Sequence, residues 1–199
     1  MMRTLTRHFM PAAAVGLLLL PALTVSAGDS HEDWQSMRVQ AKQEKIDTMA
    51  NQSLHEILAK SPKAKSLYDE AYGWAAFSDL KVALGLSGAG GKGVAVNKET
   101  GQRTYMDMGS AGAGLQLGVK KYEVVFLFEN RETFDDFVNN GWSAGAGASA
   151  IGGTAGGGVQ ASFVNGIAAY ELTKGGLMAS ADISGTKYWK SDELNGNER

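Results

Sequence analysis

The chain contains no cysteine, so it has no disulfides and no thiolate ligands, and its stability has to come from packing. Its three histidines are His8, His31 and His55, and none follows. From residue 56 onward the sequence therefore excludes zinc sites built from Cys and His, and it excludes Ser-His and Cys-His nucleophile pairs. These absences favour a binding protein over an enzyme and predict neither a metal nor a cofactor.

Residues 1–27 have the three parts of a secretory signal peptide. Arg3 and Arg7 provide the basic start, an apolar run covers Met10–Val25, and Val25-Ser26-Ala27 is a small-x-small exit. An uncut membrane anchor needs about 20 predominantly apolar residues, and this run is shorter and interrupted by prolines. The sequence therefore predicts cleavage after Ala27 and a periplasmic or secreted protein.

Cleavage would leave 172 residues, a length typical of one domain. The mature chain would hold 17 basic and 21 acidic residues, a net charge of −4. Nucleic-acid binding depends on neutralising phosphates, so a nucleic-acid partner is not expected. We divide the mature chain into an N-terminal helical segment, 28–60, and a glycine-rich domain, 61–199.

Residues 29 to about 71 show helical periodicity. One apolar stripe runs from Ile46 to Leu58, and Ser61-Pro62 predicts a stop followed by a second short helix from Pro62. Trp34, Met37 and Ala41 form a second stripe on roughly the opposite side. One continuous helix would present this second side to a partner or would be clamped between two surfaces. The alternative is that the segment frays at its start or kinks. We favour the latter because chain ends are usually poorly ordered.

From Gly73 onward the pattern changes to short β-prone runs and turns, and 24 of the 26 glycines lie there. Val124–Phe128 is apolar throughout and predicts a central strand buried on both faces. Asn130 predicts the cap of a short helix, Arg131–Asn139, with Gly141 at its C′ position. Further strands are predicted at the following positions: Val82–Leu86, Gly93–Val96, Gln102–Met106, Leu115–Val119, Tyr122–Phe128, Ala144–Ile151, Val159–Val164, Ile167–Thr173 and Leu177–Ile183. For Ala144–Ile151 a flexible loop is an equal alternative.

The expected fold is therefore α+β. N-terminal helices pack on a twisted antiparallel sheet, and whether that sheet closes into a barrel is left open. Gly88–Gly93 matches G-x-G-x-x-G, but the dinucleotide mechanism needs a helix to begin there. Here Gly93 leads into Val94-Ala95-Val96, which reads as a strand, so the match is assigned to chance. No spacing selects a catalytic pair among the carboxylates.

Aromatic and lysine side chains occur together near the predicted strand ends. Such pairs suit a surface where apolar rings meet anionic head groups. Glycines inside strands can mark bulges, barrel corners or the close approach of a ligand. The candidate lipid-contact residues are Lys120, Lys121, Tyr122, Trp142, Lys174, Lys187 and Trp189.

From about Leu54 to Asn195 the chain resembles the SYLF domain family, also known as the lipid-binding or actin-regulator type domain. The resemblance rests on blocks in family order: Ser61-Pro62-x-Ala64-Lys65, Ala71–Phe77, Gly88–Val96, Gly112–Gly118, Glu123–Phe128, Phe134–Val138 and Tyr170–Gly185. Met178 and Ser180 depart from the family's Phe and Gly. Residues 151–155 lack the family's arginine, which weakens any transfer of inositol-phosphate recognition.

The resemblance implies phospholipid binding, and eukaryotic members are linked to phosphoinositides and actin. For an exported bacterial chain, the phospholipid of the envelope is the natural substitute. We therefore expect a non-catalytic protein that binds phospholipid or an anionic membrane surface. The alternative is a structural module of the envelope that binds another protein and no lipid.

Overall fold

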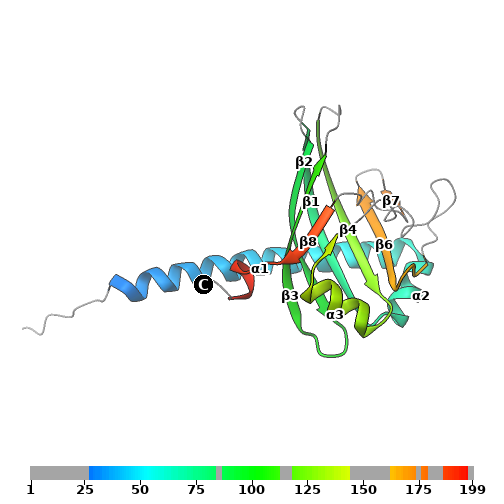
Figure 1. Ribbon diagram of the computed structural model, residues 1–199, viewed down its shortest axis with the longest axis horizontal. Coiled ribbons are helices and arrows are strands. Elements are labelled where there is room, and N and C mark those ends of the chain that lie inside the picture. The colour runs from blue at the N-terminus through cyan, green and yellow to red at the C-terminus, as the bar shows by residue number, and fades with distance from the viewer. Residues whose placement is uncertain are drawn as a thin grey trace, which may run out of the picture.

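The computed structural model describes residues 27–83, 87–112, 118–143, 162–173, 176–178 and 186–196. Within these ranges the chain forms three helices and eight strands, and a short 3₁₀ turn follows at Glu193–Asn195 (Figure 1). The elements are α1 (Ala27–Lys60), α2 (Pro62–Glu70), β1 (Gly73–Ala83), β2 (Ser87–Asn97), β3 (Arg103–Gly112), β4 (Gly118–Phe128), α3 (Arg131–Asn139), β5 (Trp142–Ser143), β6 (Ile167–Thr173), β7 (Gly176–Met178) and β8 (Thr186–Lys190).

The strands form one antiparallel sheet in the order β5-β8-β3-β2-β1-β4-β6-β7. The sheet curls into a half-barrel, and the helical segment precedes it in the chain, so the expected α+β fold is confirmed. Among the described strands, β5 and β7 lie at its two edges. The predicted signal peptide (except Ala27) and the predicted strand Ala144–Ile151 lie outside the described residues.

Strand β4 is central and buried on both faces, as predicted. Its side chains alternate between two separate clusters, with Val124, Phe126 and Phe128 in one and Val125 and Leu127 in the other. One predicted strand ends at Val119 and the next begins at Tyr122. This division is wrong, because β4 pairs with β1 without interruption from Gly118 to Phe128.

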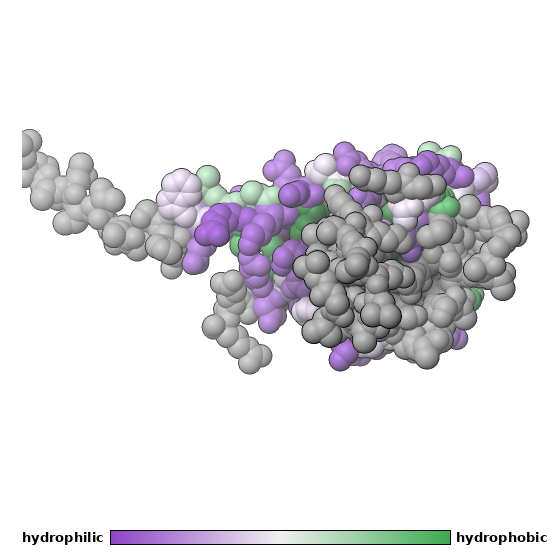
Figure 2. Space-filling model, turned by 90° about the horizontal axis from the view of Figure 1, so that it is seen from above, coloured by the Kyte–Doolittle hydropathy of each residue, from purple (hydrophilic) through white to green (hydrophobic). Residues whose placement is uncertain are grey.

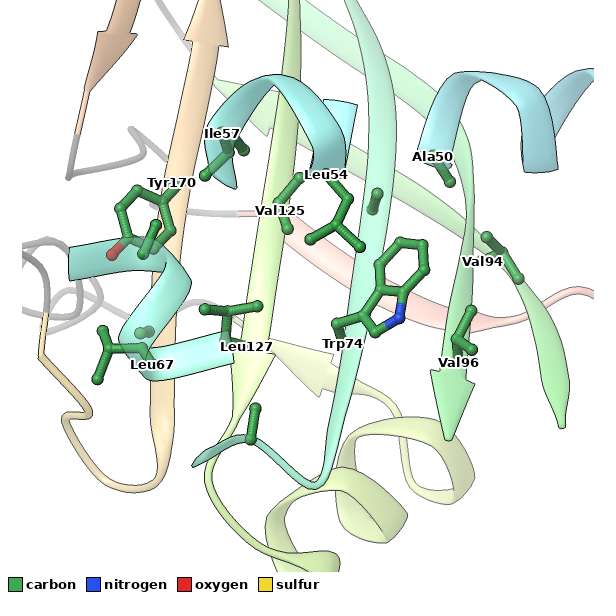
Figure 3. Packing of buried hydrophobic residues seen from close by; sticks show 14 of the residues in the cluster. Ala50, Leu54, Ile57, Leu67, Trp74, Val94, Val96, Val125, Leu127 and Tyr170 are labelled. Atoms are coloured by element: carbon green, nitrogen blue, oxygen red, sulfur yellow. The ribbon is translucent and has the colours of Figure 1, made fainter. Parts of the chain in front are cut away.

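One side of the sheet, here called the α1 face, is covered by α1 and α2. Leu54 and Ile57 of α1 pack there with Trp74 and Val125 of the strands, as the close-up shows (Figure 3). The other side, here called the α3 face, is covered by α3. Aromatic rings dominate it, and the ring centroids of Phe77 and Tyr188 lie 4.8 Å apart.

The predicted helix caps are present. The Ser61 hydroxyl accepts from the backbone amide of Ala64, and Pro62 occupies the first turn of α2. The Asn130 side chain accepts from the amide of Thr133 at the start of α3, and Gly141 after its end has a φ of +71°. These caps could be predicted from the sequence, because each cap and the residue that it contacts lie within four positions of each other.

The sequence favours a frayed start or a kink in this segment. Helix α1 is continuous from Ala27 to Lys60, so the expected kink is wrong. Its first half projects beyond the sheet (Figure 1). None of the helices in the described ranges combines the length and apolar character needed to span a membrane.

Several strand boundaries differ from those predicted. Val82 belongs to the end of β1, which begins nine residues earlier at Gly73. Residues 162–164 contain only an isolated bridge, from Val164 to Ile167, in place of a strand. The last predicted strand ends at Ile183, but β8 follows at Thr186–Lys190 and pairs with β3, far away in the sequence.

Candidate functional site

Among the candidate residues whose side chains the structure describes, Lys187 and Trp189 are the two that are exposed, and both lie on β8. Lys187 and Trp189 lie two positions apart in β8 and share a face of the sheet, because successive side chains alternate. Both are exposed, and Trp189 is 45% exposed. They point away from Tyr188, whose side chain is buried on the α3 face.

Tyr122 and Trp142 do not share this exposed surface, although Trp142 lies on β5, which pairs with β8. Tyr122 is buried in the aromatic cluster of the α3 face, and Trp142 is half-buried against it, 5.8 Å from the Tyr188 ring. Lys120 and Lys121 lie in β4, opposite Lys81 and Leu80 of β1. Lys174 lies outside the described residues. Tyr122 and Trp142 thus support the core, whereas Lys187 and Trp189 are available at the surface.

On the strands next to Lys187, two glycines continue the register. Lys187 of β8 pairs with Gly109 of β3, and Gly109 in turn pairs with Gly90 of β2. A Cβ built on Gly90 would meet no atom within 4 Å, and the residue is exposed. We call Gly90, Gly109, Lys187 and Trp189 the open strip.

Two neighbouring glycines of β2, Gly91 and Gly93, are needed for packing inside the protein. A Cβ on Gly93 would lie 2.2 Å from the carbonyl oxygen of Ala76 and 2.4 Å from the Phe77 ring, and one on Gly91 would lie 2.1 Å from the Ser78 carbonyl oxygen. At these two positions the protein's own atoms occupy the space. The expectation that bare glycine backbone admits a ligand is therefore wrong for Gly91 and Gly93, and Gly90 remains open.

A network of charges borders the open strip. The Lys92 ammonium donates to Asp107 at 2.7 Å and lies 3.5 Å from Glu193, which also pairs with Lys42 of α1. Partial burial works to lower the pKa of Lys92, but the hydrogen bond and charge of Asp107 outweigh it, and the net pKa is raised. The hydrogen bond from Lys42 holds the pKa of Glu193 below its ordinary value. This network is satisfied internally and fastens α1 and the 3₁₀ turn to the sheet.

A second polar contact fastens α1 further along. The Tyr105 hydroxyl donates to Asp47 Oδ2 at 3.1 Å, and Arg103 Nε lies 3.5 Å from Asp47 Oδ1. Burial, and then the charge of Asp47, raise the pKa of Tyr105 to about 12. The Tyr105 hydroxyl is therefore protonated at physiological pH and can donate this hydrogen bond to Asp47.

Between the projecting half of α1 and the C-terminal turn lies an open groove of about 500 Å³. Its lining combines α1, β3 and the turn: Ser36, Val39, Gln40, Gln43, Arg103, Tyr105, Leu194, Asn195 and Gly196. The Gln43 side-chain amide donates to the Leu194 carbonyl at 2.7 Å, which holds the turn against the helix. Sequence reasoning missed this groove, because its walls come from three distant segments.

The described residues contain no group of three or more His, Cys, Asp or Glu side chains that could hold a metal ion. His55 is exposed on α1. The chemistry available at the open strip is therefore that of an ammonium group, an indole ring and backbone amides.

Comparison with known proteins gives two matches. Residues 109–197 match the family model described as Ysc84, Las17-binding protein actin regulator. Beta cell expansion factor A of Aeromonas veronii is 40% identical to the chain over 154 residues, which cover 77% of this chain and 59% of that protein. The chain belongs to the SYLF domain family.

The chain thus spans about three fifths of the length of this relative. At the family level, the SYLF domain is a binding or regulatory domain. The family match includes Gly109, Lys187 and Trp189 of the open strip, and it begins after Gly90 and after α1.

Proposed function

We propose that this SYLF protein binds the surface of phospholipid membranes without catalysis, and that it does so in the bacterial envelope, outside the cytoplasm. The observation that carries the proposal is the open strip. An exposed tryptophan and an exposed lysine lie two positions apart on one face of β8. Lys187 pairs with Gly109, which pairs with Gly90, an exposed residue at which an added Cβ would meet no atom within 4 Å.

The physical roles follow from the side chains. An indole has an apolar body and one N–H donor, a combination that favours the boundary between head groups and acyl chains. A lysine near an anionic membrane surface contributes about 1 kcal/mol of attraction. The exposed backbone at Gly90 lets the head-group layer approach the sheet more closely than a side chain would permit.

The net charge of the mature chain limits how it can bind an anionic membrane. A mature chain with a net charge of −4 is repelled on average by anionic lipid. Binding therefore has to be local and oriented, with the strip facing the bilayer. We expect moderate affinity that decreases with added salt.

The experiment starts from the full gene expressed in a bacterium, with the processed chain purified from the periplasm or the medium. Mass spectrometry of its N-terminus tests export and cleavage after Ala27. Co-sedimentation with vesicles, either neutral or containing anionic phospholipid, then tests binding. We expect binding that is stronger to the anionic vesicles.

Variants locate the surface. Trp189→Ala and Lys187→Glu should each reduce the bound fraction severalfold. Lys63→Glu is the matched control, because Lys63 is an exposed lysine on α2 and the charge change is identical. The proposal fails if the processed chain binds neither kind of vesicle. The strip is the wrong surface if the control reduces binding as much as Lys187→Glu does.

An envelope module that binds another protein is the second candidate. The projecting half of α1, with its exposed apolar side chains, favours it. The family description names a protein partner, which is consistent with this kind of binding. Co-sedimentation separates the two candidates, since a pure protein-binding module would remain in the supernatant with every vesicle.

A further inference from the structure

The projecting half of α1 carries an apolar stripe that the rest of the chain does not use. Trp34 is 65% exposed and Met37 is 58% exposed, and Ala41 on the same side is also exposed. Figure 2 shows pale and light-green residues along one side of this helix, with purple residues along the other. The buried residues of α1, such as Ile46 and Ala50, face the opposite way, into the sheet.

The spacing of the stripe is that of a coiled-coil seam. Positions 34, 37 and 41 are separated by three and then four residues, which corresponds to a, d and a of a heptad. In this frame Asp33 occupies position g and Arg38 position e, on the two flanks of the seam. Both side chains are exposed, and within the described ranges neither takes part in an ion pair.

These flanking charges are complementary to a second copy of the same helix. In a parallel pair, each g position lies beside the e position five residues later in the partner, and such pairs set orientation. Asp33 of each copy would then face Arg38 of the other. An antiparallel pair would bring e beside e and g beside g, so that Arg38 and Lys45 would meet like charges.

We propose that the chain associates with a second copy of itself through residues 33–41 of α1, as a short parallel coiled coil closed by two Asp33–Arg38 ion pairs. The inference is independent of the membrane proposal, which rests on the opposite end of the chain. It also gives a reason for the straight projection of α1 beyond the sheet.

The same charges argue against a membrane as the occupant. An anionic bilayer would attract Arg38, but Asp33 on the other flank and Glu44, one turn after Ala41, would be repelled by it. Glu44 also occupies the next d position and ends the seam. The contact is therefore small, well below the roughly 1,600 Å² of a standard interface, and we expect association that depends on concentration.

A charge swap tests the pairing. The processed full chain is followed by sedimentation velocity over a concentration series. Asp33→Arg and Arg38→Asp should each weaken association about tenfold, because each places like charges across both contacts. The double variant should restore it, and so should an equimolar mixture of the two single variants. The proposal is overturned if the double variant associates as weakly as the singles, or if the unmodified chain stays monomeric throughout.

A cross-link tests the orientation. Because the chain has no cysteine, Ala41→Cys introduces a unique thiol at a seam position, which lies beside itself only in a parallel pair. Mild oxidation should yield a disulfide-linked dimer from Ala41→Cys and little from Lys63→Cys, which places the thiol on α2. Equal yields from both variants would contradict the parallel seam. If Trp34→Ala abolishes vesicle binding while the unmodified chain remains a monomer, a lipid surface and not a second copy covers the stripe.

Discussion

The two glycines at positions 90 and 93 of β2 should respond in opposite ways to the same substitution. At Gly93 an added Cβ would lie 2.2 Å from the Ala76 carbonyl oxygen and 2.4 Å from the Phe77 ring. The oxygen belongs to the backbone of β1 and cannot rotate away, so the sheet itself has to shift. Overpacking of this kind costs about 1–3 kcal/mol, and a contact with fixed backbone places Gly93→Ala near the upper end.

At Gly90 the added Cβ would meet nothing within 4 Å. Glycine inside a strand costs roughly 0.5–1 kcal/mol relative to alanine through its greater loss of backbone freedom, so Gly90→Ala should raise the free energy of unfolding by about that amount. The free energies of unfolding of the two variants should therefore differ by about 3–4 kcal/mol, although each variant gains only one methyl group and the two sites are three residues apart.

Urea unfolding followed by tryptophan fluorescence measures this difference, since the indole of Trp74 is buried and reports on the core. The comparison is valid when both variants keep the m-value of the unmodified chain. Equal destabilisation by the two substitutions would refute the distinction between a packed and an open glycine, and with it the assignment of the open strip.

Two further predictions concern the contacts that fasten α1 to the sheet. Tyr105→Phe removes the hydrogen bond to the Asp47 carboxylate and should lower the free energy of unfolding by about 1.5–3 kcal/mol in urea titrations, whereas an unchanged value would mean that the contact contributes nothing. Glu193 has a lowered pKa in the folded protein, so its contribution to stability is present above the ordinary glutamate pKa and is lost as the pH falls through the folded value. Thermal unfolding of Glu193→Gln between pH 7 and pH 3 should accordingly show a smaller loss of Tm on acidification than the unmodified chain, and an identical pH profile would count against the pairing with Lys42.

Local signals in the sequence were sufficient for the helices of the domain. Ser61-Pro62 and Asn130 each act within four residues of their own position, so the starts of α2 and α3 could be predicted to the residue. The central position of β4 was also predictable, because Val124–Phe128 has no polar residue and must be buried on both faces.

The ends of the strands could not be predicted, because they depend on pairing with strands that are distant in the sequence. The predicted strands left out Lys120 and Lys121, but β4 pairs continuously with β1 through both residues. No strand was predicted at Lys187–Lys190, but Tyr188 lies in the aromatic cluster and pairs with Met108, eighty residues earlier.

The candidate site was predictable only in part. Lys187 and Trp189 were singled out by residue type and by their place near a predicted strand end, and period-two alternation then places them on one face. Tyr122 was singled out by the same reasoning and is buried, because a tyrosine followed by a valine-rich run fits a core strand as well as a rim. The neighbourhood of Gly90 follows from the pairing of three strands, which no local pattern encodes.

Contact between Trp189 and lipid is the most direct test of the membrane proposal. Vesicles containing brominated phospholipid quench the emission of any indole that reaches the acyl region. We predict that the unmodified chain is quenched, that Trp34→Phe retains this quenching, and that Trp189→Phe loses it. Quenching that is unchanged in Trp189→Phe would contradict the account, because another part of the molecule would then be in contact with the bilayer.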